Sequence, residues 1–162
     1  MQEVKVAIIT VSDSCYEGRR VDENKAIIER MVGRIGGRVV FYEIVPDDLE
    51  AIKERLIRCA DELGVDLVLT NGGTGYSPRD VTPEATREVI EKEVPGIPEA
   101  MRFEGFKSTK RAILSRAIAG IRGRTLIINL PGSSRGVRES LEAILDVLPH
   151  GLEMLRGEGH KR

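Results

Sequence analysis

The stretch DLVLTNGGTG, residues 66–75, decides the predicted fold. Its apolar first half is typical of a strand that is covered on both faces of a parallel sheet. Gly72, Gly73 and Gly75 then allow positive φ angles and carry no Cβ, so successive backbone N–H groups can converge on an anion, and Thr74 adds a hydroxyl donor. The stretch therefore predicts a strand that ends in a phosphate-binding loop, with a tight strand-to-helix turn as the alternative.

The glycine loop differs from the two commonest nucleotide-binding motifs. No Gly-Lys-Ser or Gly-Lys-Thr follows residues 72–75, and the G-x-G-x-x-G spacing is absent. A P-loop ATPase and a nicotinamide-dependent dehydrogenase are therefore disfavoured.

Strand and helix patterns alternate on both sides of this stretch. They predict an α/β fold with three layers: a mostly parallel sheet with helices on both faces, plus a small β-hairpin turning at Gly123. Pro149 is expected to interrupt the last helix. Strands are predicted over residues 4–11, 38–45, 66–70, 117–121 and 125–130, and helices over 22–34, 47–63, 82–93, 97–106 and 135–155.

Length and composition limit the class of protein. The chain has 162 residues, of which 41% are hydrophobic and 31% charged, which predicts one domain over residues 1–162 with a frayed tail after about residue 157. No apolar run approaches the ~20 residues of a membrane span, and the N-terminus lacks signal-peptide features. Cys15 and Cys59 are too few for a disulfide framework. We expect a cytoplasmic protein with no membrane partner.

The charge balance argues against a nucleic-acid partner. The formal net charge is −1, and aromatic residues make up only 4% of the chain, too few for a base-stacking platform. Basic residues gather in residues 102–116 and 122–138, where they could attract an anionic ligand or simply form a solvated face.

Polar or glycine-rich loops follow four of the predicted strands. In doubly wound sheets, ligands bind beyond the carboxyl ends of the strands, where the strand order reverses. The topology therefore predicts a binding site at this rim before any family is considered. The four loops are residues 12–14, 46–48, 71–75 and 131–134.

The acidic residues of these loops have two interpretations each. Asp80 could hold a Mg²⁺ ion against phosphate oxygens, with Arg79 pairing with phosphate, or it could form a turn before an N-cap at Thr82. Asp47 could bind metal, or it could cap a helix together with Glu50. The pattern alone leaves both interpretations open.

Three other polar residues of the rim are open in the same way. Asp13 could bind ligand or bond the turn after its strand. Ser133 or Ser134 could cap the last helix, whose N-terminus is also suited to an anion. Cys59 lies on an apolar helical stripe, and the sequence places no nucleophile or metal ligand at a recognisable spacing from His150, so neither is expected to act in catalysis.

Six motifs together resemble the MogA/MoaB family of molybdenum cofactor biosynthesis proteins. Their order and spacing fit that family over nearly the whole chain, and residues 72–84 are the most specific part. The motifs are TVSD at 10–13, VPD at 45–47, LTNGGTG at 69–75, RDVTPE at 79–84, ILSR at 113–116 and NLPG at 129–132.

The resemblance implies a molybdopterin-binding fold and a reaction. The terminal phosphate of molybdopterin attacks the α-phosphate of ATP, which gives adenylylated molybdopterin and pyrophosphate with Mg²⁺ as cofactor. It also implies a homotrimer, sometimes a hexamer, and a molybdenum-insertase partner. Because some family members keep the fold without this activity, a non-catalytic molybdopterin-binding or assembly protein is the alternative, and a nucleotide-metabolising relative is a third.

The resemblance also implies roles for matching positions. Asn71 departs from the pattern, since many family members have Thr there. Asp47 and Asp80 are implied to be catalytic and metal-binding. The remaining implied residues are Ser12, Asp13, Gly72, Gly73, Thr74 and Gly75 for the nucleotide and its phosphates, and Ser115, Pro131, Gly132, Ser133 and Ser134 for the pterin.

Overall fold

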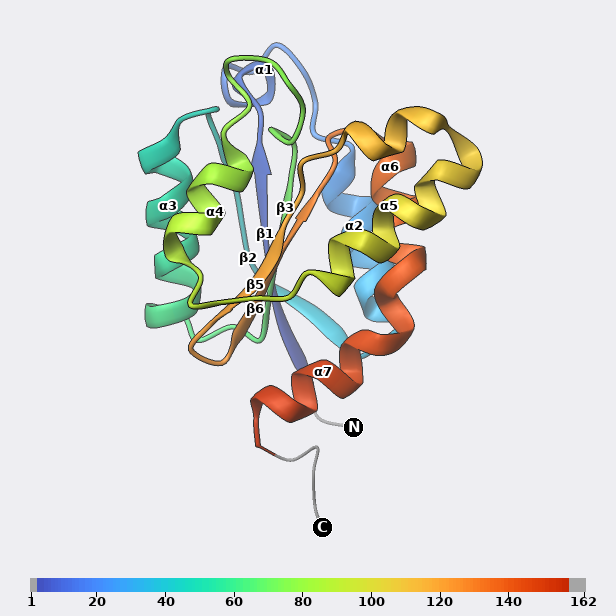
Figure 1. Cartoon of the computed structure of the whole chain (residues 1–162). Helices are drawn as coiled ribbons and strands as arrows, with labels where there is room; N and C mark the ends of the chain where they lie inside the picture. The colour runs from blue at the N-terminus through green and yellow to red at the C-terminus, as the bar shows by residue number, and fades with distance from the viewer. Residues whose placement is uncertain (1–2, 158–162) are drawn as a thin grey trace.

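A six-stranded, mostly parallel sheet forms the centre of the molecule (Figure 1). The computed structural model describes residues 3–157, so the tail prediction lies outside the described residues. The strand order is β2-β1-β3-β6-β5-β4, in which β2, β1, β3 and β6 run parallel and β5 pairs antiparallel with both of its neighbours, β6 and β4. The strands are β1 Val4–Val11, β2 Gly37–Val45, β3 Leu67–Asn71, β4 Lys92–Glu93, β5 Ala119–Arg122 and β6 Thr125–Leu130.

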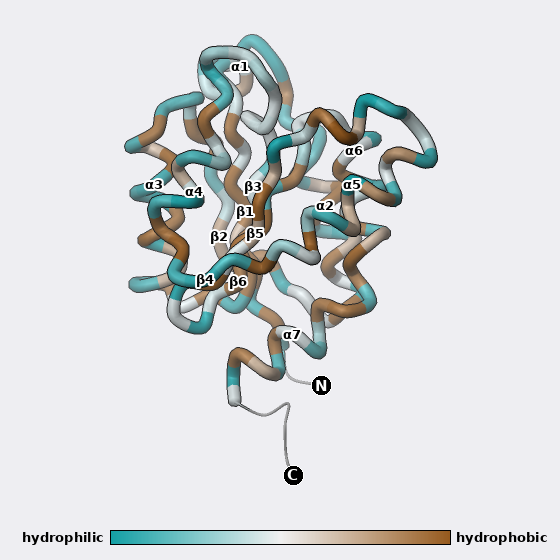
Figure 2. Tube along the Cα trace, viewed as in Figure 1, coloured by the Kyte–Doolittle hydropathy of each residue, from teal (hydrophilic) through white to brown (hydrophobic). Residues whose placement is uncertain are grey.

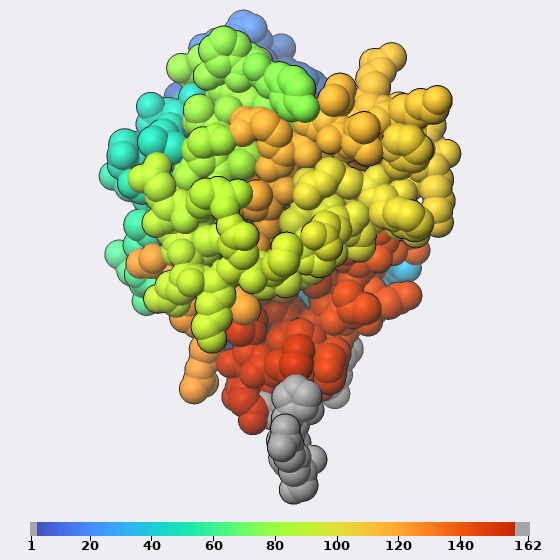
Figure 3. Space-filling model, viewed as in Figure 1, coloured from blue at the N-terminus to red at the C-terminus, as the bar shows by residue number. Residues whose placement is uncertain are grey.

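Helices cover both faces of the sheet, as predicted. Figure 1 shows α3 and α4 on one face and α2, α5, α6 and α7 on the other, with short α1 above the end of β1. Figure 3 shows α4, β4 and α5, coloured green to yellow, spread across one side of the molecule. The helices are α1 Asp13–Tyr16, α2 Asn24–Gly33, α3 Leu49–Ile57, α4 Thr82–Val89, α5 Gly96–Ser108, α6 Ser134–Ile144 and α7 Leu148–Leu155, with shorter turns at Arg58–Glu62, Lys110–Leu114 and Leu145–Val147.

Alternating side chains of the central strands build two hydrophobic cores. Ile8 and Leu69 face the core under α2, α5, α6 and α7, whereas Ile9 and Val68 face the core under α3 and α4. All five residues of β3 are buried. Figure 2 shows the apolar residues concentrated along the strands and polar residues on the outer turns. The three-layer prediction is confirmed.

The strand order reverses between β1 and β3. The chain passes from β1 out to β2 and returns across β1 to β3, so α2 and α3 lie on opposite faces. Carboxyl ends of parallel strands at such a point leave a crevice for ligands. The predicted hairpin is also present, since Arg122 pairs with Thr125 around Gly123, whose φ is 60°.

The predicted helix over residues 82–93 is too long. It ends at Val89, and Lys92 pairs with Ile121 as the edge strand β4. Ile90 packs so closely on the sheet that a Cβ at Gly120 would lie 2.5 Å from its Cδ1 atom. This pairing with β5 overrides the local helical preference of the segment.

Two further helix predictions need correction. The predicted helix over 47–63 begins at Leu49 and loosens into a π-type turn at Arg58–Glu62, which leaves Leu63 exposed. The predicted helix over 135–155 breaks at Leu145–Val147, before Pro149 rather than at it. Pro149 lies in the first turn of α7, where a missing N–H costs little.

No helix within residues 3–157 has the length and apolar character that crossing a membrane requires.

The two cysteines should differ strongly in reactivity. Cys59 is 0% exposed, and burial raises its pKa to about 11, whereas Cys15 is half-buried at the strand-end rim. Because the thiolate is the reactive form, a thiol reagent at neutral pH should modify native protein at Cys15 and reach Cys59 only after unfolding. Mass spectrometry of the labelled peptides measures this, with Cys15→Ser as the control. Rapid labelling of Cys59 in native protein would contradict the packing described here.

Candidate functional site

Two adjoining cavities lie at the carboxyl ends of the central strands. The β1–β3 cavity has a volume of about 350 Å³ and is lined by strand-end residues that include Ser12, Asp47 and Asp80. The α5–α6 cavity has a volume of about 320 Å³ and lies between α5, α6 and the turn before β5. Ser133 lines both cavities. Both volumes are at the lower end of the range for small-molecule sites.

Close backbone contacts build the wall between the cavities. Gly72 has φ 99°, and a Cβ there would lie 2.2 Å from the Val11 carbonyl oxygen. Gly73 has φ 71°, and its Cβ would lie 2.2 Å from Thr82 Oγ1. Gly132 in turn lies against Gly72, whose Cα is 3.4 Å from the position of a Cβ on Gly132. We call residues 72–75 and 131–134 together the glycine ridge.

Gly75 has a different role from the one expected. Among the described glycines with positive φ, Gly72 and Gly73 confirm the prediction, but Gly75 is not one of them. Its lack of a side chain instead leaves room for Asp80, because a Cβ at Gly75 would lie 2.9 Å from Asp80 Oδ2. That carboxylate oxygen accepts a hydrogen bond from the Ser77 backbone N–H at 2.9 Å.

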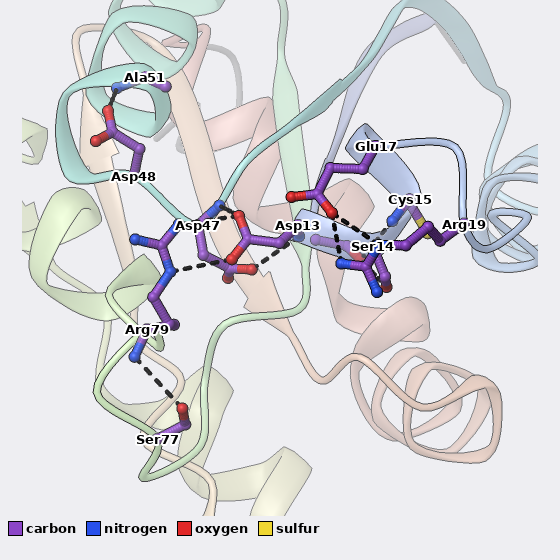
Figure 4. A network of polar contacts seen from close by, with 11 residues as sticks. Asp13, Ser14, Cys15, Glu17, Arg19, Asp47, Asp48, Ala51, Ser77 and Arg79 are labelled. Carbon is purple, nitrogen blue, oxygen red and sulfur yellow. Dashed lines mark hydrogen bonds and ion pairs between the residues drawn. The ribbon is translucent and has the colours of Figure 1, made fainter.

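Asp13 and Asp47 lock the ends of β1 and β2 together (Figure 4). The backbone N–H of Asp13 donates to Asp47 Oδ2, and the backbone N–H of Asp47 donates to Asp13 Oδ1, both at 2.9 Å. Arg79 donates two hydrogen bonds to the Asp13 carboxylate, each at 3.0 Å. These bonds exclude the local interpretation of each residue, and the ligand-binding role of each stays a prediction.

Asp47 does not cap a helix. Asp48 caps α3 instead, accepting from the Ala51 backbone N–H at 2.9 Å, so the predicted capping box with Glu50 is wrong. Asp13 bonds the amide of Asp47 rather than the turn that follows its own strand. Ser12 provides that bond, because its side chain accepts from the Cys15 N–H and caps α1.

The two linked carboxyl groups are shifted in opposite directions. The hydrogen bonds from Arg79 are the main cause that lowers the pKa of Asp13. Burial is the main cause that raises the pKa of Asp47, and the nearby charges of Asp13 and Asp80 add to it. A bound cation would favour the ionised form of a carboxyl group that is partly buried and lies near other negative charges.

Arg116 fixes the loop that carries Asp80. Its guanidinium donates to the carbonyl oxygens of Gly75 and Asp80, at 2.8 and 2.9 Å, and its backbone N–H donates to the Thr74 carbonyl at 3.0 Å. Glu84 accepts a further bond from the same guanidinium. The sequence marked Arg116 only as the last residue of the ILSR motif and gave no sign of this contact.

The β1–β3 cavity fits a Mg²⁺ ion that completes its coordination with ligand oxygens. Asp47 and Asp80 both line it, and within residues 3–157 no group of three or more His, Cys, Asp and Glu could hold a metal ion alone. Thr82 Oγ1, close to Gly73, is the one buried side-chain oxygen or nitrogen in that range without a hydrogen-bond partner. Mg²⁺ usually binds one or two carboxylates together with phosphates and water. Thr82 was predicted as the N-cap of this helix, but it is the first residue of α4 and Val81 occupies the N-cap position.

The structure divides the predicted ligand residues between the cavities differently from the resemblance. Ser133 caps α6 by accepting from the Gly136 N–H at 3.0 Å, as one interpretation expected. Asp13 lines neither cavity, because it faces Asp47 and Arg79. The β1–β3 cavity takes Ser12, Gly72, Gly73, Gly132 and Ser134, and the α5–α6 cavity takes Thr74, Gly75, Ser115 and Pro131.

Among the arginines of the rim, only Arg79 was predicted as a site residue, and those of the α5–α6 cavity were missed. Arg102, Arg111 and Arg135 line the α5–α6 cavity together with the apolar side chains of Met101 and Leu114. Arg102 donates to two backbone carbonyls, whereas Arg111 is exposed at the cavity. The basic stretches of the sequence were the available signal, but a stretch cannot show which arginines converge.

The fold and these cavities define a doubly wound α/β protein with paired ligand sites at its strand ends. The chain belongs to the family described as "Probable molybdopterin binding domain", whose model matches residues 7–150.

Individual relatives agree with this assignment. The chain is 40% identical over 159 residues to the molybdopterin adenylyltransferase of Helicobacter pylori, covering 97% of this chain and 90% of that protein. The crystal structure of the molybdopterin biosynthesis enzyme MoaB from Thermus thermophilus superimposes with a TM-score of 0.90 at 52% identity, covering 98% and 99% of the two chains. The chain is also 38% identical to the Drosophila melanogaster molybdenum cofactor synthesis protein cinnamon, but spans only 26% of it, against 96% of this chain.

Asp13 and Asp47 should give stability opposite pH dependences. A carboxyl group with a lowered pKa stabilises the fold above its unfolded pKa of about 3.9, and this contribution is lost as pH falls through the folded pKa. A carboxyl group with a raised pKa destabilises the fold as pH rises above about 3.9.

We therefore expect Asp13→Asn to be less stable than wild type at about pH 7, with the difference shrinking toward about pH 3. Relative to wild type, Asp47→Asn should gain stability as pH rises over the same range. Urea unfolding as a function of pH measures both variants. Parallel pH curves for the two variants would contradict the opposite shifts.

Proposed function

We propose that this protein is a molybdopterin adenylyltransferase of molybdenum cofactor biosynthesis. An oxygen of the terminal phosphate of molybdopterin attacks the α-phosphorus of ATP, a new P–O–P bond forms, and the bond to the β-phosphate breaks to release pyrophosphate. The observation that carries this proposal is the pair of cavities that share Ser133 across the glycine ridge. The name of the Helicobacter pylori relative supports the reaction.

Each cavity suits one substrate. In the β1–β3 cavity, two carboxylates and the glycine loop suit a nucleotide triphosphate with Mg²⁺. In the α5–α6 cavity, apolar side chains suit a flat heterocycle, and Arg111 and Arg135 suit its phosphate. The resemblance assigned Gly132 and Ser134 to the pterin, and their place in the β1–β3 cavity moves them to the nucleotide side of our proposal.

The proposed reaction needs positioning and charge stabilisation more than a protein nucleophile. The bound Mg²⁺ ion would neutralise phosphate charge. Asp47 and Asp80 would hold that ion, and Arg116 keeps the loop of Asp80 in place through two backbone carbonyls. The backbone N–H of Gly72 donates to the Leu130 carbonyl oxygen at 3.1 Å, so in our proposal the phosphates would be bound by N–H groups of the ridge other than that of Gly72.

Assembly and location are further proposals. We propose a homo-oligomer, a trimer before a hexamer, and four exposed apolar side chains on α5 and the following turn support a contact between copies: Phe103, Phe106, Ile113 and Leu114. A molybdenum-insertase partner would use the adenylylated product. A cytoplasmic location stays a prediction.

Replacement of one carboxylate tests the proposal directly. Purified protein with molybdopterin, ATP and Mg²⁺ should release pyrophosphate and form adenylylated molybdopterin, detected by mass spectrometry. Asp80→Asn should reduce the rate about a hundredfold or more, because the metal loses a charged ligand. Its amide oxygen can still accept from the Ser77 N–H, so the loop should keep its shape.

Asp48→Asn is the matched control. It removes a carboxylate one residue from Asp47, outside the cavity lining, and Asn caps a helix as well as Asp. This variant should keep both stability and rate. An active Asp80→Asn protein would overturn the role of that residue, and molybdopterin binding without turnover by wild type would identify a non-catalytic binding protein.

A further inference from the structure

Asn24 links the glycine ridge to the end of β3 in the lining of the β1–β3 cavity. It is the first residue of α2 and only 7% exposed. Its side-chain Nδ2 donates to the Gly132 carbonyl oxygen at 2.8 Å and to Asn71 Oδ1 at 3.0 Å. Its Oδ1 accepts from Ser134 Oγ at 2.9 Å. One amide group therefore joins the loop before α6, at Gly132 and Ser134, to Asn71, the last residue of β3 and the neighbour of Gly72 in the chain.

The hydrogen bonds of this group can point in only one direction. The Gly132 carbonyl can only accept, so the NH₂ side of Asn24 must face it and Asn71 Oδ1. Asn71 is then oriented to donate through Nδ2 to Thr10 Oγ1 at 2.9 Å. Thr10 in turn donates to Asp22 Oδ2 at 2.6 Å. Because Asn71 accepts through Oδ1, it donates through Nδ2, and Thr10, which accepts that bond, donates its only hydroxyl proton to Asp22.

Asp22 is the acceptor at the end of this chain of bonds. Its carboxylate also accepts from the Tyr42 hydroxyl at 2.6 Å and from the Asn24 backbone N–H at 3.0 Å. Burial, and then the hydrogen bond to Asp22, raise the pKa of Tyr42, so this phenol stays a donor at neutral pH. The network thus spans β2, β1, β3, α2 and the ridge, and satisfied buried networks of this kind hold their members rigidly.

The network also determines what Ser134 can do. Asn24 Oδ1 can only accept, so the single hydroxyl proton of Ser134 is donated to it. That proton is not available to a phosphate oxygen while the bond lasts. Ser134 therefore lines the β1–β3 cavity without using its hydroxyl as a ligand donor.

We propose that Asn24 is a positioning residue that sets the distance between the two cavities. This inference rests on the proposed function, in which the distance between the cavities sets how far the phosphate of the pterin lies from the α-phosphorus of ATP. Asn24 lines the β1–β3 cavity, but both protons of its amide are donated within the protein, to Asn71 and Gly132, so it offers no hydrogen bond donor to a ligand. Loss of its amide would leave each cavity able to bind its own ligand but would let the loop at Gly132 shift relative to Gly72.

Steady-state kinetics of Asn24→Ala separate positioning from binding. We expect kcat to fall ten- to hundredfold, because small displacements of reacting groups are costly, while KM for ATP and for molybdopterin changes less than about threefold. Ser134→Ala removes one bond of the same network and is the milder second variant. It should lower kcat several-fold and leave both KM values unchanged.

Thr125→Val is the control for lost stability. Thr125 is 2% exposed and donates a buried hydrogen bond of 2.6 Å to the Val65 carbonyl, at the opposite end of β6 from the ridge. We expect Thr125→Val to lower the melting temperature as much as Asn24→Ala does but to keep the kcat of wild type.

Equal kcat losses in Asn24→Ala and Thr125→Val, or a raised KM in Ser134→Ala, would overturn the positioning role. Wild-type turnover in the same assay decides the proposed function separately. Without wild-type turnover, binding is measured instead: Asn24→Ala should leave ATP binding to free protein unchanged and weaken ATP binding to molybdopterin-saturated protein by up to about threefold, because only the second depends on the distance between the cavities. Equal effects on the two would refute the proposal.

Discussion

The whole site depends on the close approach of Gly72 to the end of β1. A Cβ at this position would lie 2.2 Å from the Val11 carbonyl oxygen, a distance that no side chain tolerates, and the φ of 99° is itself suited to glycine. Because the chain crosses β1 so tightly, Gly73 arrives beside Asp47 and Thr82, and Gly132 can rest on Gly72. The wall between two cavities follows from this single contact.

Charge is distributed unevenly around that wall. On one side, Asp47 is half-buried with a raised pKa, next to Asp13, which is neutralised by Arg79. On the other side, three arginines and Glu139 line a cavity with apolar side chains such as Met101 and Leu114. A bound cation would relieve the first environment and would also attract phosphates, and a phosphorylated aromatic ligand would suit the second. The arrangement explains how two anionic substrates could be held close together without a protein nucleophile.

Much of the fold could be predicted from the sequence because its signals are local. Continuous apolar runs such as Leu67–Leu69, and glycines directly after them, identify buried strands and the rim where they end. What could not be predicted depends on contacts between distant segments. Asn24 meets a partner 47 residues away and another 108 residues away, and no spacing rule connects them. Likewise, α4 ends at Val89 because the next residues pair with β5, and Asp48 rather than Asp47 became the cap because Asp47 is held by Asp13.

In our proposal, two ligands occupy the neighbouring cavities at the same time. Calorimetric titration of a non-hydrolysable ATP analogue with Mg²⁺ into protein saturated with molybdopterin would detect simultaneous binding. We expect the analogue to bind at one site per chain while molybdopterin stays bound. Displacement of molybdopterin by the analogue would show that the two ligands share one cavity and would refute the two-cavity arrangement.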